Sequence, residues 1–147
     1  MNANRIEQAR AASDELVAAM ARLLPQLGEV QPPDRRELDE LIAAPATTLL
    51  VARDGERIVG TLTLTVYRTP TKLRAWIDDV VVDRGARGAG FGAALVEEAL
   101  RLAARRGAAR VDLTTRPARA EANRLYQRLG FERRETNVYA RRLDRPA

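Results

Sequence analysis

The chain has neither cysteine nor histidine among its 147 residues. These two absences exclude a thiol nucleophile, a Ser-His-Asp triad and the usual zinc site made of imidazole or thiolate ligands, and we expect no metal. A general base must therefore be a carboxylate, a tyrosine, the single lysine Lys72, a backbone group or a bound water. Without cysteine, disulfide usage carries no information about the cellular compartment.

Long apolar runs are also missing. No stretch approaches the roughly 18 residues that a membrane span needs, and the opening MNANRIEQAR is polar and mixed in charge, unlike a signal peptide. We therefore expect a cytoplasmic protein that does not bind membranes. The length indicates one domain, residues 1–147. A domain of this size buries enough surface to fold without disulfides or metal.

The formal charge is +5, almost all of it from arginine, and only 4% of the residues are aromatic. One interpretation is an anionic partner, such as a phosphorylated cofactor or a nucleic acid. The other is a composition rich in Arg and Ala throughout, as GC-rich genomes encode. The few aromatic residues and the lack of a recognised binding motif argue against nucleic acid. Function is therefore argued only from arginines at informative positions.

Local signals predict the order of helices and strands. Ser13 is expected to cap a first helix, and Asp34 with Glu37 forms a capping box at the start of a second. The sequence Asp54-Gly55-Glu56 predicts a hairpin turn. We expect a mixed α/β (α+β) sheet with helices on its faces. The expected strands lie near Ile6 and at 47–53, 57–67, 73–82, 110–114, 131–135 and 137–142, with later helices ending at Arg106 and spanning 120–129.

The most informative segment is a glycine-rich turn between the β-branched run Val80–Val82 and a helix. Glycines let the backbone approach a ligand, and the first N–H groups of a helix, with its dipole, bind anions. A charged arginine side chain adds a strong contact to phosphate. The residues of this turn are Arg87, Gly88, Ala89, Gly90, Phe91 and Gly92.

Other ligands use a similar turn. A nucleoside triphosphate loop needs Gly-Lys-Ser/Thr, which is absent. The spacing of Gly88, Gly90 and Ala93 matches a dinucleotide fingerprint variant with Asp112 further on. However, Asp112 lies inside its own strand pattern, and too little chain follows for a doubly wound fold. A purely structural tight turn is a further alternative.

Here the sequence resembles the GNAT superfamily of N-acetyltransferases. Residues Arg87–Gly92 fit the family's Gln/Arg-x-x-Gly-x-Gly/Ala motif, and Asn123 to Phe131 resembles its later Asn-x-x-Tyr-x-x-x-Gly-Phe segment. The likeness covers roughly residues 47–140. It implies a mostly antiparallel central sheet of six to seven strands, with helices on both faces and a splay between the fourth and fifth strands. It also implies transfer of an acetyl group from acetyl-CoA to an amine.

The resemblance assigns expected roles to residues of this chain. The pyrophosphate of acetyl-CoA would bind Arg87–Gly92, and the backbone of Val80, Val81 and Val82 would pair with the pantetheine arm. The N–H of Val80 would stabilise the developing oxyanion. Tyr126 would protonate the departing thiolate, and Asn123, on the same helical face, would bind the cofactor. The alternatives are that Val80–Val82 and Tyr126 serve only packing.

The base and the acceptor site are less constrained. An alkylammonium must lose a proton before it attacks, which costs about 4–5 kcal/mol at pH 7. Asp79 is favoured over Asp78 as the base, although a bulge in this strand would change which side chain faces the cleft. Either aspartate has the alternative of bonding only backbone or arginine. Residues expected to line the acceptor pocket are Asp78, Trp76, Tyr67, Arg116 and Tyr139. The alternatives are that Trp76 is a core anchor and Arg116 a solvated loop residue.

Two interpretations of different class stay open. The first is direct acetyl transfer to a primary amine of a small molecule or protein in a ternary complex, since no cysteine can carry the acyl group. The segment Ile77–Val82 also resembles amino-sugar phosphate acetyltransferases of the superfamily, which does not identify the acceptor. The second is a non-catalytic module of the same fold that senses acyl-CoA. The resemblance also allows a homodimer.

Overall fold

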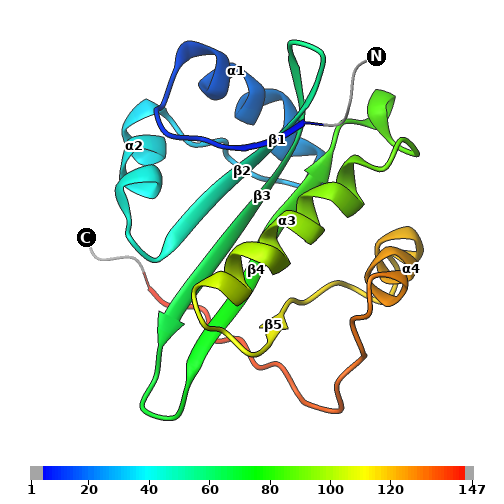
Figure 1. Ribbon diagram of the computed structural model, residues 1–147. Coiled ribbons are helices and arrows are strands. Elements are labelled where there is room, and N and C mark those ends of the chain that lie inside the picture. Colours follow the sequence, from blue (N-terminus) through cyan, green and yellow to red (C-terminus); the bar gives the residue numbers. More distant parts are fainter. Residues whose placement is uncertain (1–4, 145–147) are drawn as a thin grey trace. The chain divides into compact units, whose positions relative to one another are not determined.

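The computed structural model describes residues 5–144, and the chain divides into two compact units, residues 1–114 and 115–147. The single domain expected from the length stays a prediction. The first unit holds the sheet and most helices, and the second holds one helix and an extended segment (Figure 1). Along the chain the elements are β1 (Arg5–Gln8), α1 (Asp14–Leu23), η1 (Leu24–Leu27), α2 (Arg35–Ala43), β2 (Thr47–Asp54), β3 (Arg57–Arg68), β4 (Leu73–Val82), η2 (Arg84–Ala86), α3 (Phe91–Arg105), β5 (Val111–Asp112) and α4 (Ala120–Arg128).

The strands form one five-stranded sheet in the order β1-β2-β3-β4-β5. The first three pairings are antiparallel, and β4 pairs with β5 in parallel. The expected hairpin joins β2 and β3, with Gly55 at a φ of 60° that suits glycine. A mixed, mostly antiparallel sheet is therefore confirmed.

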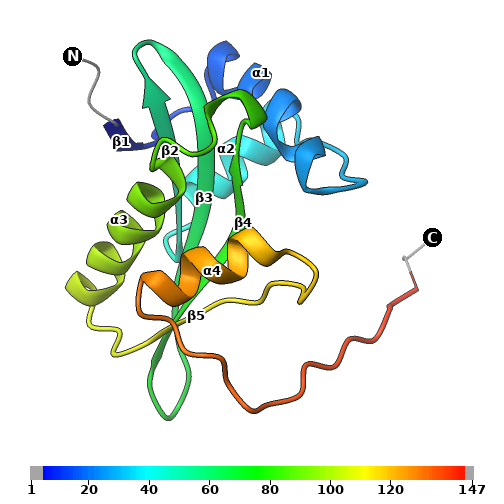
Figure 2. The same ribbon diagram turned by 90° about the vertical axis from the view of Figure 1, so that its right-hand side faces the viewer.

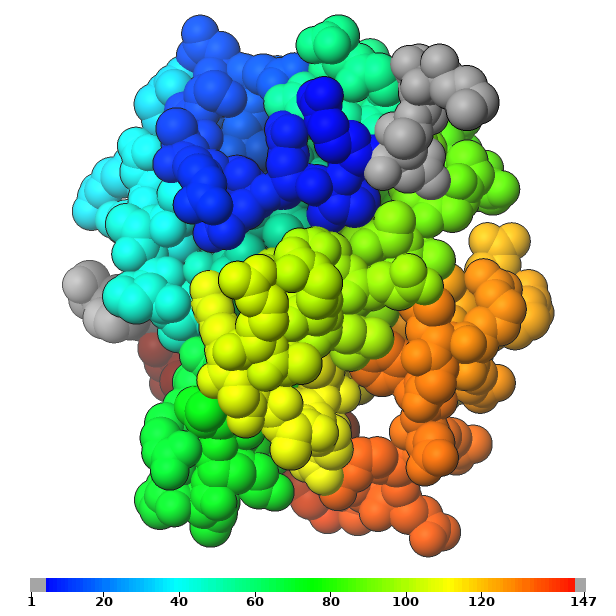
Figure 3. All heavy atoms as spheres, in the orientation of Figure 1, coloured from blue at the N-terminus to red at the C-terminus, as the bar shows by residue number. Residues whose placement is uncertain are grey.

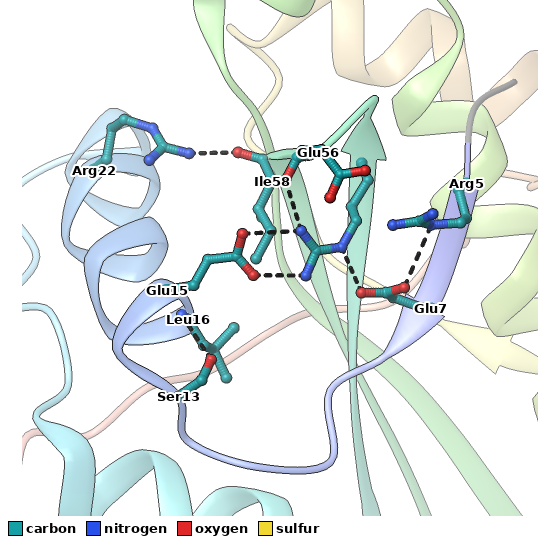
Figure 4. A network of polar contacts seen from close by, with 9 residues as sticks. Arg5, Glu7, Ser13, Glu15, Leu16, Arg22, Glu56 and Ile58 are labelled. Atoms are coloured by element: carbon teal, nitrogen blue, oxygen red, sulfur yellow. Dashed lines mark hydrogen bonds and ion pairs between the residues drawn. The ribbon is translucent and has the colours of Figure 1, made fainter. Parts of the chain in front are cut away.

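The expected helix starts are also confirmed. The Ser13 hydroxyl accepts a hydrogen bond from the N–H of Leu16 at 3.2 Å (Figure 4). Asp34 and Glu37 make both hydrogen bonds of the capping box. These contacts satisfy N–H groups that the first helical turn leaves without partners. The starts of α1 and α2 are thus fixed by residues next to them in the sequence.

The sheet carries helices on both faces. Figure 2 shows α3 on one side of the sheet and α1 with α2 on the other. In the space-filling view, α3 covers the sheet face that is turned toward the viewer (Figure 3). On that face, Gly60 lets the helix approach closely, since a Cβ there would lie 3.2 Å from Cδ1 of Leu95. The core on the opposite face joins α1 and α2 to the sheet through Leu16, Ala19, Met20, Leu23, Leu38, Leu49, Val51, Ile58 and Val81.

Arg53 ties three elements together at one end of the sheet. Its guanidinium donates to Glu7 of β1 at 2.6 Å, to Glu15 of α1 at 2.7 and 3.0 Å, and to the main-chain oxygen of Glu56 at 2.8 Å. Figure 4 shows Glu7, Glu15 and Glu56 converging on one guanidinium. The hydrogen bonds to Glu15 and Glu7 raise the pKa of Arg53, so the cation persists at every working pH. The network anchors α1 beside β1 and the hairpin of β2 and β3.

Two expected strands, 131–135 and 137–142, are wrong. The described part of the segment after α4 contains no strand, so the sheet has five strands rather than six to seven. The strand expected at 110–114 is only Val111–Asp112. A strand needs a ladder for its N–H and C=O groups, and the side chains of 132–144 are exposed, so no apolar face holds them on a sheet. Within residues 5–144, no helix is long and apolar enough to cross a membrane.

Candidate functional site

The glycine-rich turn lies between β4 and α3, as expected. Figure 2 shows β4 running into η2 and then into α3. Gly88 and Gly90 adopt φ values of 84° and 87°, a region that favours glycine. Gly90 is the N-cap of α3 and contributes no side-chain hydrogen bond to the first turn. The start of this 15-residue helix therefore presents main-chain N–H groups that a bound anion can satisfy.

Arg87 is held at the end of β4. Its Nε donates a hydrogen bond to the main-chain oxygen of Val82 at 3.0 Å, and the residue is exposed. One N–H of the guanidinium therefore fixes the side chain beside the turn, and a guanidinium has five such donors in all. A cation at this place adds its charge to the dipole of α3.

Beyond its first half, β4 separates from β5. The two strands pair only at Ala75 with Val111 and at Trp76 with Asp112. From Ile77 to Val82, β4 continues to pair with β3 but has no ladder on its other edge within the described chain. The expected splay between the fourth and fifth strands is confirmed. It leaves the backbone of one strand edge available along the segment that leads to the turn.

A β-bulge lies in this same half of β4. Thr63 pairs with Asp78 and Thr61 with Val81, so Asp79 and Val80 together face Leu62. Asp79 has a φ of 51°, in the left-handed region that is costly for a non-glycine residue. Aspartate adopts this region more often than most residues, and here it accompanies the bulge.

The bulge changes which face the strand presents. Ile77 pairs with Leu64 of β3, and Leu64 pairs with Thr48 of β2. Thr48 accepts a hydrogen bond from Arg106 at the end of α3, so Ile77 lies on the sheet face that α3 covers. Regular alternation would place Val81 on the α3 face with Ile77. Instead Val81 belongs to the core under α1 and α2. The extra residue is therefore what turns the end of β4 over before it enters the glycine-rich turn.

Several candidate side chains share one face of β3 and β4. Directly opposite residues of antiparallel strands point to the same side. Thr65 pairs with Trp76, Thr63 with Asp78, and Tyr67 with Arg74. We call Thr63, Thr65, Tyr67, Trp76 and Asp78 the polar strand face. Sequence reasoning missed the two threonines, although the alternation Thr61-Leu62-Thr63-Leu64-Thr65 is a signal for them.

Asp78 has an altered acidity. Partial burial and then the negative charge of Asp79 raise the pKa of its carboxyl, while a hydrogen bond from Trp76 opposes them. Both carboxylates are exposed enough to meet solvent. A raised pKa makes a carboxylate a better proton acceptor once it is ionised. Asp78 therefore combines a place on the polar strand face with a basicity above that of an ordinary aspartate.

The second unit carries Asn123 and Tyr126 on one side of α4. Nδ2 of Asn123 donates to the main-chain oxygens of Arg116 and Arg119, at 3.0 and 2.8 Å. The N-cap of α4, Arg119, makes no side-chain capping bond. Asn123 therefore holds the turn before α4 from within the helix and leaves its own carbonyl oxygen as the group that can accept from a ligand.

Tyr126 is the buried residue of α4, with 8% of its surface exposed. Its ring meets that of Phe131 edge-on, with centroids 5.7 Å apart. The main-chain N–H of Phe131 also donates to the oxygen of Tyr126 at 2.9 Å. Burial raises the pKa of the phenol, and the charge of Arg119 opposes the shift. The hydroxyl is thus protonated at neutral pH, as a general acid must be.

The remaining expected residues lie in different settings. Arg116 is exposed at the turn that Asn123 holds. Tyr139 is 88% exposed in the extended segment, and Tyr67 is 41% exposed on the polar strand face. The structure thus brings Tyr67 and Trp76 together with Asp78. Arg116 and Tyr139 belong to the second unit, with Asn123 and Tyr126.

A hollow of about 280 Å³ lies at the opposite end of β4 from the glycine-rich turn. None of the expected site residues lines it. Its walls come from the starts of β4 and β5 and the loop after α3, namely Lys72, Leu73, Arg74, Gly107, Ala109, Arg110 and Asp112. Within residues 5–144, no three carboxylate side chains gather as a metal site would require.

Comparisons with known proteins bear on this geometry. A family model described as "Acetyltransferase (GNAT) family" matches residues 14–131. This range contains β4, the glycine-rich turn, α4 and Tyr126. No curated protein matches the chain significantly.

Solved structures with the same fold cover nearly the whole chain. A protein of Bacillus halodurans C-125, described as a transcriptional regulator, is 28% identical, with a TM-score of 0.81 over 95% of this chain and 99% of that one. A Trypanosoma brucei acetyltransferase is 26% identical, with a TM-score of 0.78 over 97% and 99%. An aminoglycoside acetyltransferase from an uncultured soil metagenomic sample is 22% identical, with a TM-score of 0.82 over 97% of each chain, and shows the fold alone.

Proposed function

Because the chain belongs to the GNAT family of acetyltransferases, we propose that it transfers an acetyl group from acetyl-CoA to a primary amine by direct transfer in a ternary complex. One observation carries the proposal. β4 diverges from β5 and leads, through glycines at positive φ, to a helix start that has no side-chain cap. A strand edge followed by an anion site suits a pantetheine arm followed by a pyrophosphate.

The proposed binding mode uses main-chain groups. The N–H groups of the turn residues hold the pyrophosphate, and Arg87 adds its charge from the side chain fixed at Val82. The main chain of Val80, Val81 and Val82, along the edge of β4 that carries no further strand, is proposed to hydrogen-bond the pantetheine amides, and the oxygen of Val82 on this segment also accepts from Arg87. In the bulge, Asp79 and Val80 together lie opposite the single residue Leu62, so β3 does not hydrogen-bond both of them. The N–H of Val80 is the proposed donor to the thioester oxygen that becomes negative as the amine attacks.

In the proposed reaction the amine nitrogen attacks the thioester carbonyl carbon, the new C–N bond forms and the C–S bond breaks. The sequence favoured Asp79 as the general base. We assign this role to Asp78 instead. Asp78 lies on the polar strand face and has the raised pKa, while Asp79 occupies the strained bulge position. Asp78 takes one proton from the ammonium before the attack, directly or through water. Tyr126 protonates the thiolate, and the second proton, which the nitrogen loses after the C–N bond forms, returns to the phenolate of Tyr126.

The two aspartates are separated by their effects on the pH profile of kcat/KM. Asp78→Asn is expected to lower kcat/KM by about 10²-fold, because it removes the base. Asp79→Asn is expected to keep most activity and to move the acidic limb to lower pH, because the charge of Asp79 raises the pKa of Asp78. Steady-state rates from pH 5 to 9 test both variants. A full loss with Asp79→Asn and none with Asp78→Asn would return the role to Asp79.

The acceptor is proposed to lie against the polar strand face, with Trp76 and Tyr67 beside the amine. Arg116 is a candidate for binding an acidic group of the acceptor, and Tyr139 for a wall of its pocket. Asn123 is proposed to accept a hydrogen bond from the cofactor through its carbonyl oxygen.

A second function is a non-catalytic module that binds acyl-CoA. The Bacillus halodurans protein, 28% identical to this chain, is described as a transcriptional regulator. Release of free thiol from acetyl-CoA, measured across a panel of primary amines, separates the two functions. Amine-dependent release supports the transferase, whereas tight acetyl-CoA binding without release on any amine supports the module.

We further propose that the protein is cytoplasmic, forms a homodimer and binds neither membranes nor nucleic acid. Light scattering tests the dimer, and retention of DNA or RNA at different salt concentrations tests nucleic-acid binding.

A further inference from the structure

The two residues that join β4 to the segment proposed to bind pyrophosphate are contacted by Gln26, a side chain from a distant part of the sequence. Gln26 of η1 donates from Nε2 to the carboxylate of Asp83 at 3.3 Å and to the main-chain oxygen of Arg22 at 3.3 Å. Its Oε1 accepts from the main-chain N–H of Arg84 at 3.1 Å. A single amide therefore bridges the end of α1 to the first two residues after β4.

Asp83 is itself held from several sides. Its main-chain N–H donates to Val59 at 2.8 Å, and its oxygen accepts from Ala86 at 2.8 Å. Its carboxylate lies 3.7 Å from both Arg22 and Arg57, and only 20% of its side chain is exposed. Nε of Arg22 is buried without a hydrogen bond, so its compensation is the charge of Asp83. Figure 4 shows the other end of this guanidinium reaching the oxygen of Ile58 in β3.

The surroundings of Asp83 change the pKa of its carboxyl. Burial by itself raises the pKa of Asp83, but the hydrogen bond from Gln26, the charges of Arg22 and Arg57 and a main-chain hydrogen bond from Gly85 outweigh it. The pKa of Asp83 is therefore lowered, and its carboxylate stays ionised at neutral pH. The N–H groups of Arg84 and Gly85 are both engaged, the first by Gln26 and the second by Asp83.

We propose that Gln26 and Asp83 are positioning residues that hold the glycine-rich turn in its binding conformation before acetyl-CoA arrives. The inference rests on the proposed function of the turn. Glycines give the free turn many conformations, and a ligand that must order a loop binds more weakly. Neither residue is assigned contact with the reacting atoms, so the pair acts on cofactor binding and not on the chemical step.

The test measures acetyl-CoA affinity and turnover separately. Gln26→Ala is expected to raise the Kd and KM for acetyl-CoA about tenfold, which corresponds to about 1.4 kcal/mol, and to leave kcat within twofold. Gln31→Ala, at an exposed glutamine in the loop before α2, is the matched control and is expected to change neither. An unchanged Kd in Gln26→Ala, or a fall in kcat with no change in KM, would overturn the proposal.

Exchanging the amide and the carboxylate between positions 26 and 83 tests whether the two side chains act on acetyl-CoA binding as a pair. Gln26→Glu places a second carboxylate beside Asp83 and is expected to weaken acetyl-CoA binding more than Gln26→Ala does. Adding Asp83→Asn supplies an amide that can donate to Glu at position 26, and the double variant is expected to recover part of the affinity that Gln26→Glu loses. A double variant that binds acetyl-CoA no more tightly than Gln26→Glu would show that the two side chains do not act as a pair.

A readout without ligand keeps this inference distinct from the proposed function. Hydrogen exchange of the main-chain amides of Arg84 and Gly85 is expected to accelerate about tenfold in Gln26→Ala, with amides of α2 unchanged. If exchange is faster in Gln26→Ala but the wild-type protein does not bind acetyl-CoA, the proposed function is refuted and the positioning role of Gln26 is kept. If exchange is unchanged in Gln26→Ala and this variant binds acetyl-CoA normally, only the positioning role is refuted.

Discussion

Replacing Tyr126 with phenylalanine is expected to lower kcat for acetyl transfer by about 10²-fold or more, with KM for acetyl-CoA changed little. The substitution keeps the ring that meets Phe131 at 5.7 Å and removes only the hydroxyl. Because burial raises the pKa of this phenol, the wild-type acid is protonated across the neutral range. Steady-state kinetics from pH 6 to 10 measure the loss, and loss of the phenol proton is expected to lower wild-type kcat at the alkaline end.

The control for Tyr126→Phe is Phe131→Leu, which weakens the aromatic contact and leaves the hydroxyl in place. If Tyr126 serves packing, Phe131→Leu should harm activity at least as much as Tyr126→Phe, and both should lower the melting temperature. If Tyr126 is the acid, Tyr126→Phe alone loses turnover at an unchanged melting temperature. A Tyr126→Phe variant with full kcat would remove the acid role.

Substituting Gly90 with alanine is expected to raise the Kd for acetyl-CoA by about 10²-fold. Gly90 caps α3 at a φ of 87°, where an L-residue costs about 1–2 kcal/mol. A turn that relaxes from this conformation also misdirects N–H groups that make charge-assisted hydrogen bonds, each worth about 1.5–3 kcal/mol. Together these terms correspond to the expected change. Isothermal titration with acetyl-CoA measures it.

Gly85→Ala is the matched control for Gly90→Ala. Gly85 lies in η2, a few residues earlier, has no positive φ, and a Cβ there would meet nothing within 4 Å. Its substitution is expected to change the Kd less than twofold. Equal effects at the two glycines would show that any added methyl group disturbs this segment, and would contradict a specific role for the conformation of Gly90.

Much of the fold followed from local signals. Ser13 and the pair Asp34 and Glu37 predict helix starts because their hydrogen bonds involve residues only three apart. The strand over 73–82 and the turn after it were equally readable, because β-branched residues and glycines restrict the backbone within a few positions. Signals of this kind need no knowledge of distant partners.

What depends on distant partners could not be read in the same way. The strands expected over 131–142 satisfy a propensity pattern, but a strand also requires a ladder, which that segment does not form. The bulge at Asp79 and Val80 becomes visible only in the register between β3 and β4. The role of Gln26 likewise depends on a contact with Asp83, 57 residues away. The family resemblance allows a bulge in this strand, but local sequence specifies neither its position nor the partner of Gln26.

A crystal structure of the protein with acetyl-CoA tests the central claim most directly. We expect the pyrophosphate within hydrogen-bond distance of the N–H groups of Arg87–Gly92, and the pantetheine along the free edge of Val80–Val82. Acetyl-CoA bound at another place, or no density at the turn at a concentration that saturates turnover, would contradict the claim.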